Sequence, residues 1–267
     1  MQTLTSDLLA MRDISDTFAI HTQAVEHAIQ VMHTHMQELL TLEDLASVAC
    51  LSPYYFNRIF RRIVGIPPGE FLSALRFQKA RSLLLSTPLS VIDVCFEVGY
   101  TSTGSFTSRF TQLVGLSPRH LRQRAHEFEL SPQEHSEWGA ANPVVQQGKY
   151  NMLLGQVNAP ENFRGAIYIG LFSKPIPQAA PIRCTMINTP GLYLINDIPD
   201  GIYHLLAAAF PIAPNLQSYF LPGKDFLVGK GARPLIIRNG RVYGDPDLTL
   251  RPPLLTDPPL VMALPLV

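Results

Sequence analysis

The chain contains only three cysteines among its 267 residues, and none belongs to a metal-binding pattern. No Cys-x-x-Cys pair and no Cys/His ligand spacing occurs, so neither a zinc site nor a disulfide framework is predicted. No apolar stretch approaches the roughly 20 residues that a membrane-spanning helix needs. A basic segment followed by an apolar run is also absent at the N-terminus, so no signal peptide is expected. We therefore expect a reduced, cytoplasmic protein with no metal or other cofactor and no membrane partner.

A net charge is absent as well, because 21 Lys and Arg residues balance 21 Asp and Glu residues. The balance does not hold locally. Residues 51–125 contain ten basic and three acidic residues, whereas residues 21–50 contain four acids and no Lys or Arg. A basic segment of this kind is typical of nucleic-acid binding. A solvated face would give the same counts, so charge alone leaves both interpretations open.

Prolines are scarce before residue 128, where five occur, and common after it, where the other 18 of the 23 occur. Proline ends helices and favours turns and strand edges, so the first part can be helical and the second cannot be mainly helical. Apolar residues alternate with period two in the second part, and Asn239-Gly240 is a strong hairpin signal.

These patterns predict a two-domain α plus β protein. An all-α domain of about seven helices precedes an all-β sandwich of about seven strands. We expect an N-terminal extension at residues 1–20, the helical domain at 21–127, a polar linker at 128–143 and the β domain at 144–267.

Within the helical part, one segment occurs twice. The sequence LEDLASVACLSPYYFNRIFRRIVGIPP, residues 42–68, returns from Val91 as VIDVCFEVGYTSTGSFTSRFTQLVGLSP. Such a repeat indicates one small structural unit used twice. Each copy has a capped helix, a tight turn and a second helix, which is the pattern of a helix-turn-helix. The turn places Cys50 opposite Gly99; Gly99 is expected in a left-handed conformation and Cys50 at a packed small-residue position.

In a helix-turn-helix the second helix enters the major groove and its early residues reach the base edges. In the first copy, Phe56 and Phe60 share the buried face of that helix. Asn can pair with adenine and Arg with guanine, while Tyr can pack on sugars or thymine methyl groups. The predicted base-reading residues of the first copy are therefore Tyr54, Tyr55, Asn57 and Arg58. The alternative is that these side chains are exposed to solvent and contact no DNA.

The second copy differs at the exposed positions. Its predicted base-reading residues are Thr103, Gly104, Ser105, Thr107 and Ser108. Ser108 aligns with Arg58, and short hydroxyl side chains offer little bidentate readout, so the first copy is expected to dominate base discrimination. The predicted phosphate contacts are Arg61, Arg62, Arg109, Arg119 and Arg122. Arg76, between the two copies, is expected to be structural.

The motifs SPYYFNRIFRRIVGIPPGEFL, LRFQKARSLLLSTPLSVIDVC, VGYTSTGSFTSRF and GLSPRHLR follow one another in residues 21–125. In order and spacing this segment resembles the DNA-binding domain of AraC/XylS transcriptional regulators. The resemblance implies two helix-turn-helix units joined by a long helix, docking in successive major grooves of double-stranded DNA. The sequence departs from the pattern at Ser108, where Arg is frequent, at Leu121, where Tyr is usual, and at Cys50, where Gly is common.

The second half is similar to carboxypeptidase regulatory-like and transthyretin-like β-sandwiches in the stretch TPGLYLINDIPDGIYHLLAAAF. Three roles stay open for it: binding a small effector, contacting a second subunit or another protein, and catalysis. His204 fits a core histidine, and Asp197 and Asp200 fit a turn. No catalytic arrangement has a recognisable context, so no enzyme is predicted.

The sequence thus predicts a sequence-specific DNA-binding transcriptional regulator with double-stranded DNA as its partner. RNA polymerase, a small effector or a second subunit are further partners that the sequence leaves open. The alternative is a DNA-tethered module for protein–protein interaction or scaffolding, without small-molecule control. Activation and repression are not distinguished by any residue.

Overall fold

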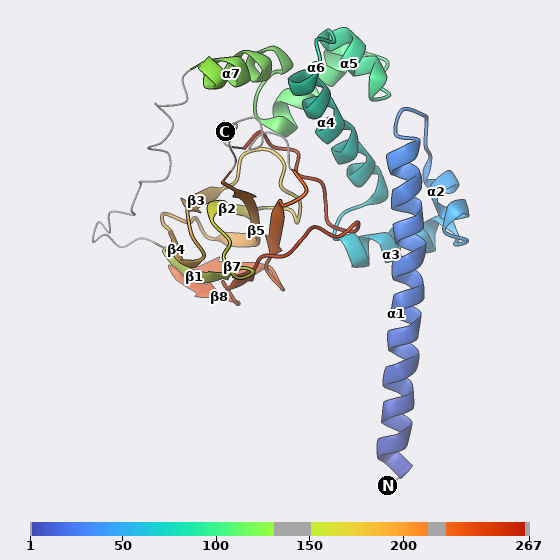
Figure 1. Cartoon of the computed structure of the whole chain (residues 1–267). Helices are drawn as coiled ribbons and strands as arrows, with labels where there is room; N and C mark the ends of the chain where they lie inside the picture. The colour runs from blue at the N-terminus through green and yellow to red at the C-terminus, as the bar shows by residue number, and fades with distance from the viewer. Residues whose placement is uncertain (1, 131–150, 213–222, 265–267) are drawn as a thin grey trace.

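The computed structural model describes residues 2–130, 151–212 and 223–264, which form a helical region followed by a β region (Figure 1). This order agrees with the expected two-domain α plus β arrangement. The predicted linker at 128–143 lies, from residue 131 onward, outside the described residues. None of the helices in the described ranges is long and apolar enough to cross a membrane.

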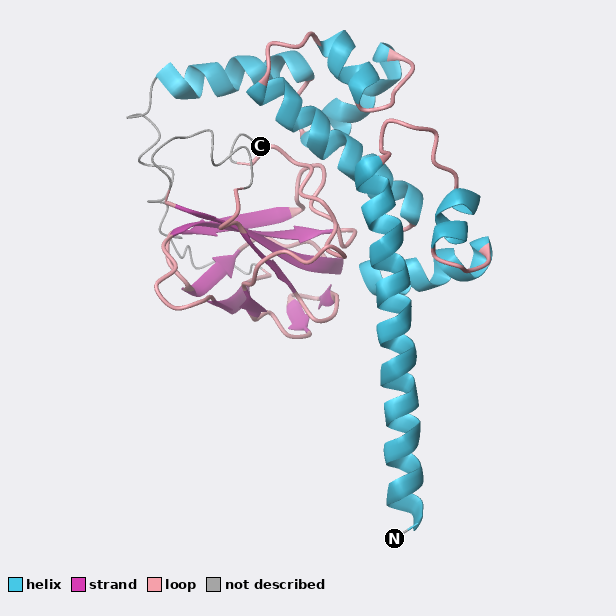
Figure 2. Cartoon of the chain, turned by 45° about the vertical axis from the view of Figure 1, so that its right-hand side comes forward, coloured by secondary structure: helices cyan, strands magenta, loops and turns pink. Residues whose placement is uncertain are grey.

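The helical region begins with a long helix, α1 (Gln2–Thr34), whose N-terminal half extends away from the rest of the molecule (Figures 1 and 2). The predicted extension at residues 1–20 is thus, from Gln2, continuous with the first helix of the helical region. Six shorter helices follow it in the described residues, namely α2 (Leu42–Val48), α3 (Pro53–Val64), α4 (Pro68–Ser86), α5 (Val91–Glu97), α6 (Thr103–Val114) and α7 (Pro118–Leu130). The sequence repeat corresponds to the pairs α2–α3 and α5–α6.

Both copies of the repeat begin with the same local device. Thr41 and Asp44 form a capping box at the start of α2, and Ser90 and Asp93 form one at the start of α5. In each box the hydroxyl accepts a hydrogen bond from the third helical N–H while the carboxylate accepts one from the cap residue. These reciprocal bonds satisfy N–H groups that would otherwise have no partner, and they fix where each unit starts.

Both copies also end alike. Gly65 and Gly115 terminate α3 and α6 in left-handed conformations, with φ of 97° and 94°. The turn inside each copy uses a second left-handed residue, which is Gly99 with φ of 78° in the second copy and Cys50 with φ of 54° in the first. Cys50 is exposed. The expectation that packing explains this cysteine was therefore wrong; backbone conformation distinguishes the position.

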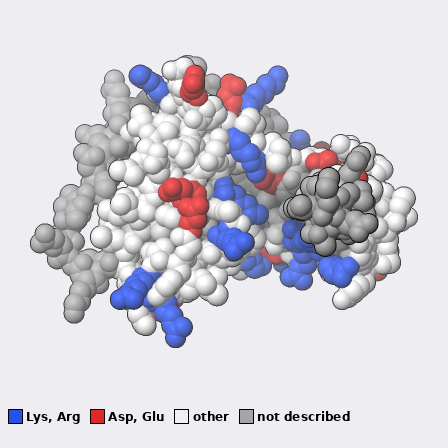
Figure 3. All heavy atoms as spheres, turned by 90° about the horizontal axis from the view of Figure 1, so that it is seen from below, with Lys and Arg blue, Asp and Glu red and all other residues white. Residues whose placement is uncertain are grey.

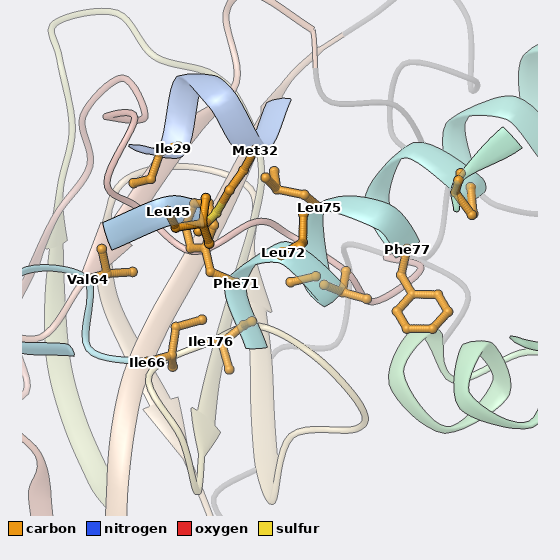
Figure 4. Packing of buried hydrophobic residues seen from close by; sticks show 14 of the residues in the cluster. Ile29, Met32, Leu45, Val64, Ile66, Phe71, Leu72, Leu75, Phe77 and Ile176 are labelled. Carbon is orange, nitrogen blue, oxygen red and sulfur yellow. The ribbon is translucent and has the colours of Figure 1, made fainter. Parts of the chain in front are cut away.

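The helical core contains four phenylalanines of the repeat, Phe56, Phe60, Phe106 and Phe110, all fully buried. Figure 4 shows part of this core, with Phe71 of α4 among its side chains. Three apolar residues of the β region join the same cluster: Ile176, Val261 and Ala263. The helical core is therefore completed by residues far along the chain.

The described β region has nine strands, against the roughly seven predicted by alternation. They are β1 (Leu153–Asn158), β2 (Gly165–Phe172), β3 (Arg183–Ile187), β4 (Gly191–Ile195), β5 (Gly201–Pro211), β6 (Leu227–Lys230), β7 (Leu235–Arg238), β8 (Arg241–Tyr243) and β9 (Leu248–Thr249). A smaller sheet has the order β4-β1-β9, and a larger one the order β3-β2-β5-β7-β8 with β6 also paired to β5. The predicted Asn239-Gly240 hairpin joins β7 to β8, and both turn residues have positive φ.

The larger sheet is covered on both of its faces along β2 and most of β5. Odd-numbered residues of β2 and β5, such as Ile169 and Leu205, share a core with residues of the smaller sheet. On the opposite face of the same strands, Phe172, Leu206 and Ala208 form a second cluster with residues of the segment Leu260–Leu264. A strand that is apolar on both sides must be covered on both sides, and the second cover is this C-terminal segment.

Candidate DNA interface

The outer face of α3 is built by the helical spacing of its residues. Phe56 and Phe60 turn into the core, so the side of the helix opposite to them projects outward. Tyr54 is 81% exposed, and Arg58 is exposed as well. An exposed aromatic ring beside an exposed guanidinium is suited to contact with sugars, phosphates or base edges.

Tyr55 lies differently from Tyr54, although both were predicted to read bases. Its hydroxyl is 3.1 Å from Nε2 of His21 in α1, and the two rings meet edge to face. Its ring also lies 4.9 Å from the guanidinium carbon of Arg58, a cation–π distance. Tyr55 is partly buried in these contacts. The structure thus gives Tyr55 a supporting position beneath Arg58, between α3 and α1.

Asn57 is partly buried at the border of the same face. Its Oδ1 atom is covered and has no hydrogen-bond partner among the described residues. A buried polar atom without a partner is uncommon and calls for an explanation. No internal bond of that oxygen fixes the Asn57 amide in place.

The corresponding face of α6 carries small side chains. Ser102 caps the helix by accepting from the N–H of Ser105 at 3.4 Å. Gly104, Ser105 and Ser108 are exposed, whereas Thr103 and Thr107 are partly buried. Glycine and short hydroxyl groups allow a close approach of the backbone to a ligand. The face is as accessible as that of α3, but it carries no long donor.

The two helices also differ at one aligned position next to this face. Ile59 is 4% exposed in α3, while Arg109, which takes its place in α6, is exposed. The surrounding aromatic pairs are kept, since Phe56 faces Phe60 at 5.6 Å and Phe106 faces Phe110 at 5.6 Å between ring centroids. The duplicated part of the unit is therefore its packing, and its surface has diverged.

The predicted phosphate contacts fall into two groups. Arg61, Arg62, Arg109 and Arg119 are exposed. Arg122 is not comparable, because its Nε donates to the carbonyl of Leu84 at 3.0 Å and its Nη2 to that of Leu89 at 2.7 Å. These bonds join α7 to the end of α4 and the following loop. Two of its three guanidinium nitrogens thus already serve the fold, and a phosphate contact by Arg122 stays a prediction.

Arg76 behaves as expected for a structural residue. It donates to the carbonyls of Met36 and Glu38, both at 2.7 Å, and burial lowers the pKa of its guanidinium. Figure 3 shows one face of the molecule, on which several Lys and Arg side chains gather in the middle. The roles of His21 and Ser102 escaped the sequence argument. A polar residue at the start of α6 was a usable signal for Ser102, whereas the His21 contact depends on tertiary structure.

A protein-family model described as a helix-turn-helix domain matches residues 45–124. These residues form an AraC-type helix-turn-helix domain. The chain is 31% identical over 112 residues to the regulatory protein PocR of Salmonella typhimurium, covering 42% of this chain and 37% of PocR. It is 37% identical over 83 residues to the transcriptional activator AarP of Providencia stuartii, covering 31% of this chain and 62% of AarP. The chain thus spans less than two thirds of either relative, and both are named as regulators.

Among solved structures, the AraC-type domain is similar to the DNA-binding domain of AdpA in complex with a target DNA. That similarity has 28% identity, a TM-score of 0.37, and coverage of 41% of this chain and 96% of that one. The C-terminal domain of AraT from Geobacillus stearothermophilus shows 33% identity, a TM-score of 0.37, and coverage of 38% and 84%. The resemblance of the β region to carboxypeptidase regulatory-like and transthyretin-like domains stays a prediction.

Proposed function

We propose that the chain is a sequence-specific DNA-binding transcriptional regulator whose α3 and α6 enter successive major grooves. The observation that carries this proposal is the duplicated scaffold. Two helices of equal length, each preceded by a helix with a capping box and each ended by a left-handed glycine, present an outer face rich in polar side chains within the basic half of the chain. A structural duplication without a ligand would not require both faces to stay accessible.

The first unit supplies most of the base discrimination in this proposal. Arg58 has the donors for bidentate contact with guanine and is held over the Tyr55 ring, which limits the entropy lost on binding. Tyr54 and Asn57 lie on the same outer side of α3. The second unit, with Gly104, Ser105 and Ser108, positions the protein on the backbone and reads few bases.

Exposed arginines supply the phosphate contacts, namely Arg61, Arg62, Arg109 and Arg119. Because each neutralised phosphate releases counterions, affinity should fall steeply with salt. The functional domain is proposed to span residues 21–127 and the second domain residues 144–267.

The test begins with selection of bound duplexes from a random library by the purified full chain. A shared motif is expected, and its absence would contradict sequence-specific binding. Binding titrations on the selected duplex then compare Arg58→Ala with Ser108→Ala. The first should lose about 1–3 kcal/mol of specific binding, and the second much less. Equal losses would contradict the asymmetry between the two units.

A second candidate function, protein–protein contact through the β region, is favoured by one observation. Ile202, Ile236 and Tyr243 lie side by side in register across β5, β7 and β8 and are 62%, 46% and 50% exposed. A row of exposed apolar side chains on a sheet is suited to a protein partner. RNA polymerase and a second subunit are both partners that such a surface can serve.

A further inference from the structure

The outer face of the larger sheet carries a small, partly open cavity of about 60 Å³. Its floor is formed by β2 and β5, with Gly170 and Ala208 among the lining residues. Its roof is formed by Leu260 and Met262 of the C-terminal segment. We call the segment Leu260–Leu264 the strap.

The chemistry of the walls defines what the cavity can hold. Apart from Tyr168 and Cys184, the described residues that line it are apolar, and none of them is charged. Cys184 is an exposed residue, but partial desolvation of its thiol raises the pKa of that group, so it stays neutral at physiological pH. An apolar cavity of this type stays dry and accepts small apolar molecules such as benzene or xenon. Water and ions would lose hydrogen bonds on entering it.

The strap connects this cavity to the AraC-type domain because its alternate residues face opposite ways. Leu260, Met262 and Leu264 belong to the apolar cluster on the sheet, whereas Val261 and Ala263 belong to the helical core. In an extended segment successive side chains point to opposite sides. A change on the cavity side of the strap therefore moves residues that are packed among the helices.

Hydrogen bonds to its main chain connect the strap to α4 and to α6. Nη1 of Arg81, in the middle of α4, donates to the carbonyl of Val261 at 3.2 Å and also to that of Met262. The N–H of Ala263 donates to the carbonyl of Val114 at the end of α6, at 3.0 Å. A neighbouring segment makes a similar contact with α6, because the N–H of Ala179 donates to the carbonyl of Leu113.

That neighbouring segment also reaches the start of α4. Lys174 pairs with Glu70 at 2.7 Å, and Gln178 donates to the same carboxylate at 2.9 Å. Between them, Ile176 enters the helical core. Pro177 of this segment lines the cavity, and its carbonyl accepts from the N–H of Val261 at 3.0 Å. The strap and the segment 174–179 thus each supply residues to the cavity lining and also contact the helices of the AraC-type domain.

We propose that the cavity under the strap binds a small, uncharged apolar molecule, and that its occupancy loosens the strap's contacts with the AraC-type domain. At about 60 Å³ the cavity is smaller than the 150 Å³ cavity that holds benzene in the best-known engineered case. A ring-sized occupant therefore has to displace Met262, the flexible residue of the roof. Displacement of Met262 moves the carbonyls that Arg81 binds, which couples the cavity to the DNA-binding half.

The first arm of the test uses benzene as the probe, the full chain and no DNA. Benzene should raise the melting temperature saturably, as expected for a molecule that binds the folded state. Ala208→Leu, which fills the cavity from its floor, should abolish the shift. His204→Leu is the matched control, since it adds apolar volume to the same face of β5 outside the lining, and it should keep the shift.

A further variant covers the case in which Ala208→Leu does not fold. Met262→Ala enlarges the cavity while keeping the backbone carbonyl, so it should bind benzene more tightly than the wild-type chain. No saturable shift in either the wild type or Met262→Ala would overturn the proposed site. An equal shift in the wild type and in folded Ala208→Leu would overturn it too.

The second arm measures the coupling and rests on the proposed DNA binding. Saturating benzene should lower the affinity for the selected duplex about fivefold or more in the wild type and leave Ala208→Leu unchanged. Unchanged affinity in the wild type would overturn the coupling. Failure of DNA binding itself would leave the first arm standing, so the two proposals fail by different results.

Discussion

Arg81 in α4 donates a hydrogen bond to the backbone carbonyl of Met262, 181 residues further along the chain. Arg81 is only 2% exposed, and its burial lowers the pKa of the guanidinium to about 10. Its Nε atom is buried without a hydrogen-bond partner among the described residues. A charge in such surroundings is tolerated because carbonyl dipoles replace part of its hydration.

Replacing Arg81 by Met keeps most of the side-chain volume and removes the donors. Two buried carbonyls then lose a partner, which costs about 1–3 kcal/mol each, and relief of the buried charge offsets part of that. We expect Arg81→Met to lower the free energy of unfolding by about 1–3 kcal/mol in urea titrations. Hydrogen exchange at the Ala263 amide should accelerate at the same time. Unchanged protection of that amide would show that Arg81 does not hold the strap.

The two turn positions of the repeat should respond in opposite directions to substitution. Cys50→Gly removes the strain of a left-handed non-glycine residue and should raise the free energy of unfolding by up to about 1 kcal/mol. Gly99→Ala should lower it by more than about 1–2 kcal/mol. The added Cβ would lie 2.7 Å from the backbone oxygen of Gln37, in addition to the strained φ of 78°. Thermal denaturation of both variants checks the pair; a loss at Cys50→Gly would argue against strain there.

The capping box of α2 gives a pH-dependent prediction. The backbone N–H and the hydroxyl of Thr41 donate to the Asp44 carboxylate at 2.9 and 2.7 Å, and they lower the pKa of that carboxyl. A carboxyl whose folded-state pKa is depressed stabilises the fold above its unfolded pKa, near 3.8. This contribution disappears as the pH falls through the lower folded-state value.

Thr41→Val removes the hydroxyl and keeps the backbone donor, so the Asp44 pKa should rise part of the way toward its ordinary value. NMR titration of the Asp44 carboxyl measures this rise. Ser90→Ala is the matched control in the second box and should leave the titration of Asp44 as it is. If Thr41→Val also leaves it unchanged, the hydroxyl bond is not responsible.

Salt dependence should separate the exposed arginines from the internal one. Arg62→Ala should reduce the slope of log affinity against log salt by about 0.9 with little change in stability. Arg122→Ala should keep the slope but lower the melting temperature, because the carbonyls of Leu84 and Leu89 lose their donors. DNA titrations at several salt concentrations check the slopes, and thermal scans check the stabilities. A reduced slope for Arg122→Ala would show that Arg122 contacts a phosphate.

The sequence was sufficient to predict the helical half because its signals are local. Thr41 and Ser90 start the two units, and Gly65 and Gly115 end α3 and α6. The spacing of Phe56 and Phe60 indicates the buried side of α3. Such caps, turns and periodicities depend on a few neighbouring residues. They determine which residues face outward on α3 and α6, which is why the exposure of Tyr54 and Arg58 could be predicted.

The remaining features depend on contacts between distant segments. The residues next to Tyr55 in the sequence do not predict its contact with His21. The sequence around Arg122 likewise does not predict its bonds to the carbonyls of Leu84 and Leu89, because these are brought near it only by the fold. The segment Leu260–Leu264 is apolar throughout, so period-two alternation could not show that its two sides face different partners. A continuous apolar run predicts a buried element, but it does not show which surfaces cover that element.

The strap also determines when the helical core can be completed during translation. Val261 and Ala263 belong to the core that surrounds α4 and α6, yet they leave the ribosome long after those helices. Newly made helices can pack through their own repeat, but a part of their apolar surface stays uncovered until residue 263 has been added. The nascent helical half is thus exposed to premature association for the whole time needed to synthesise the β region.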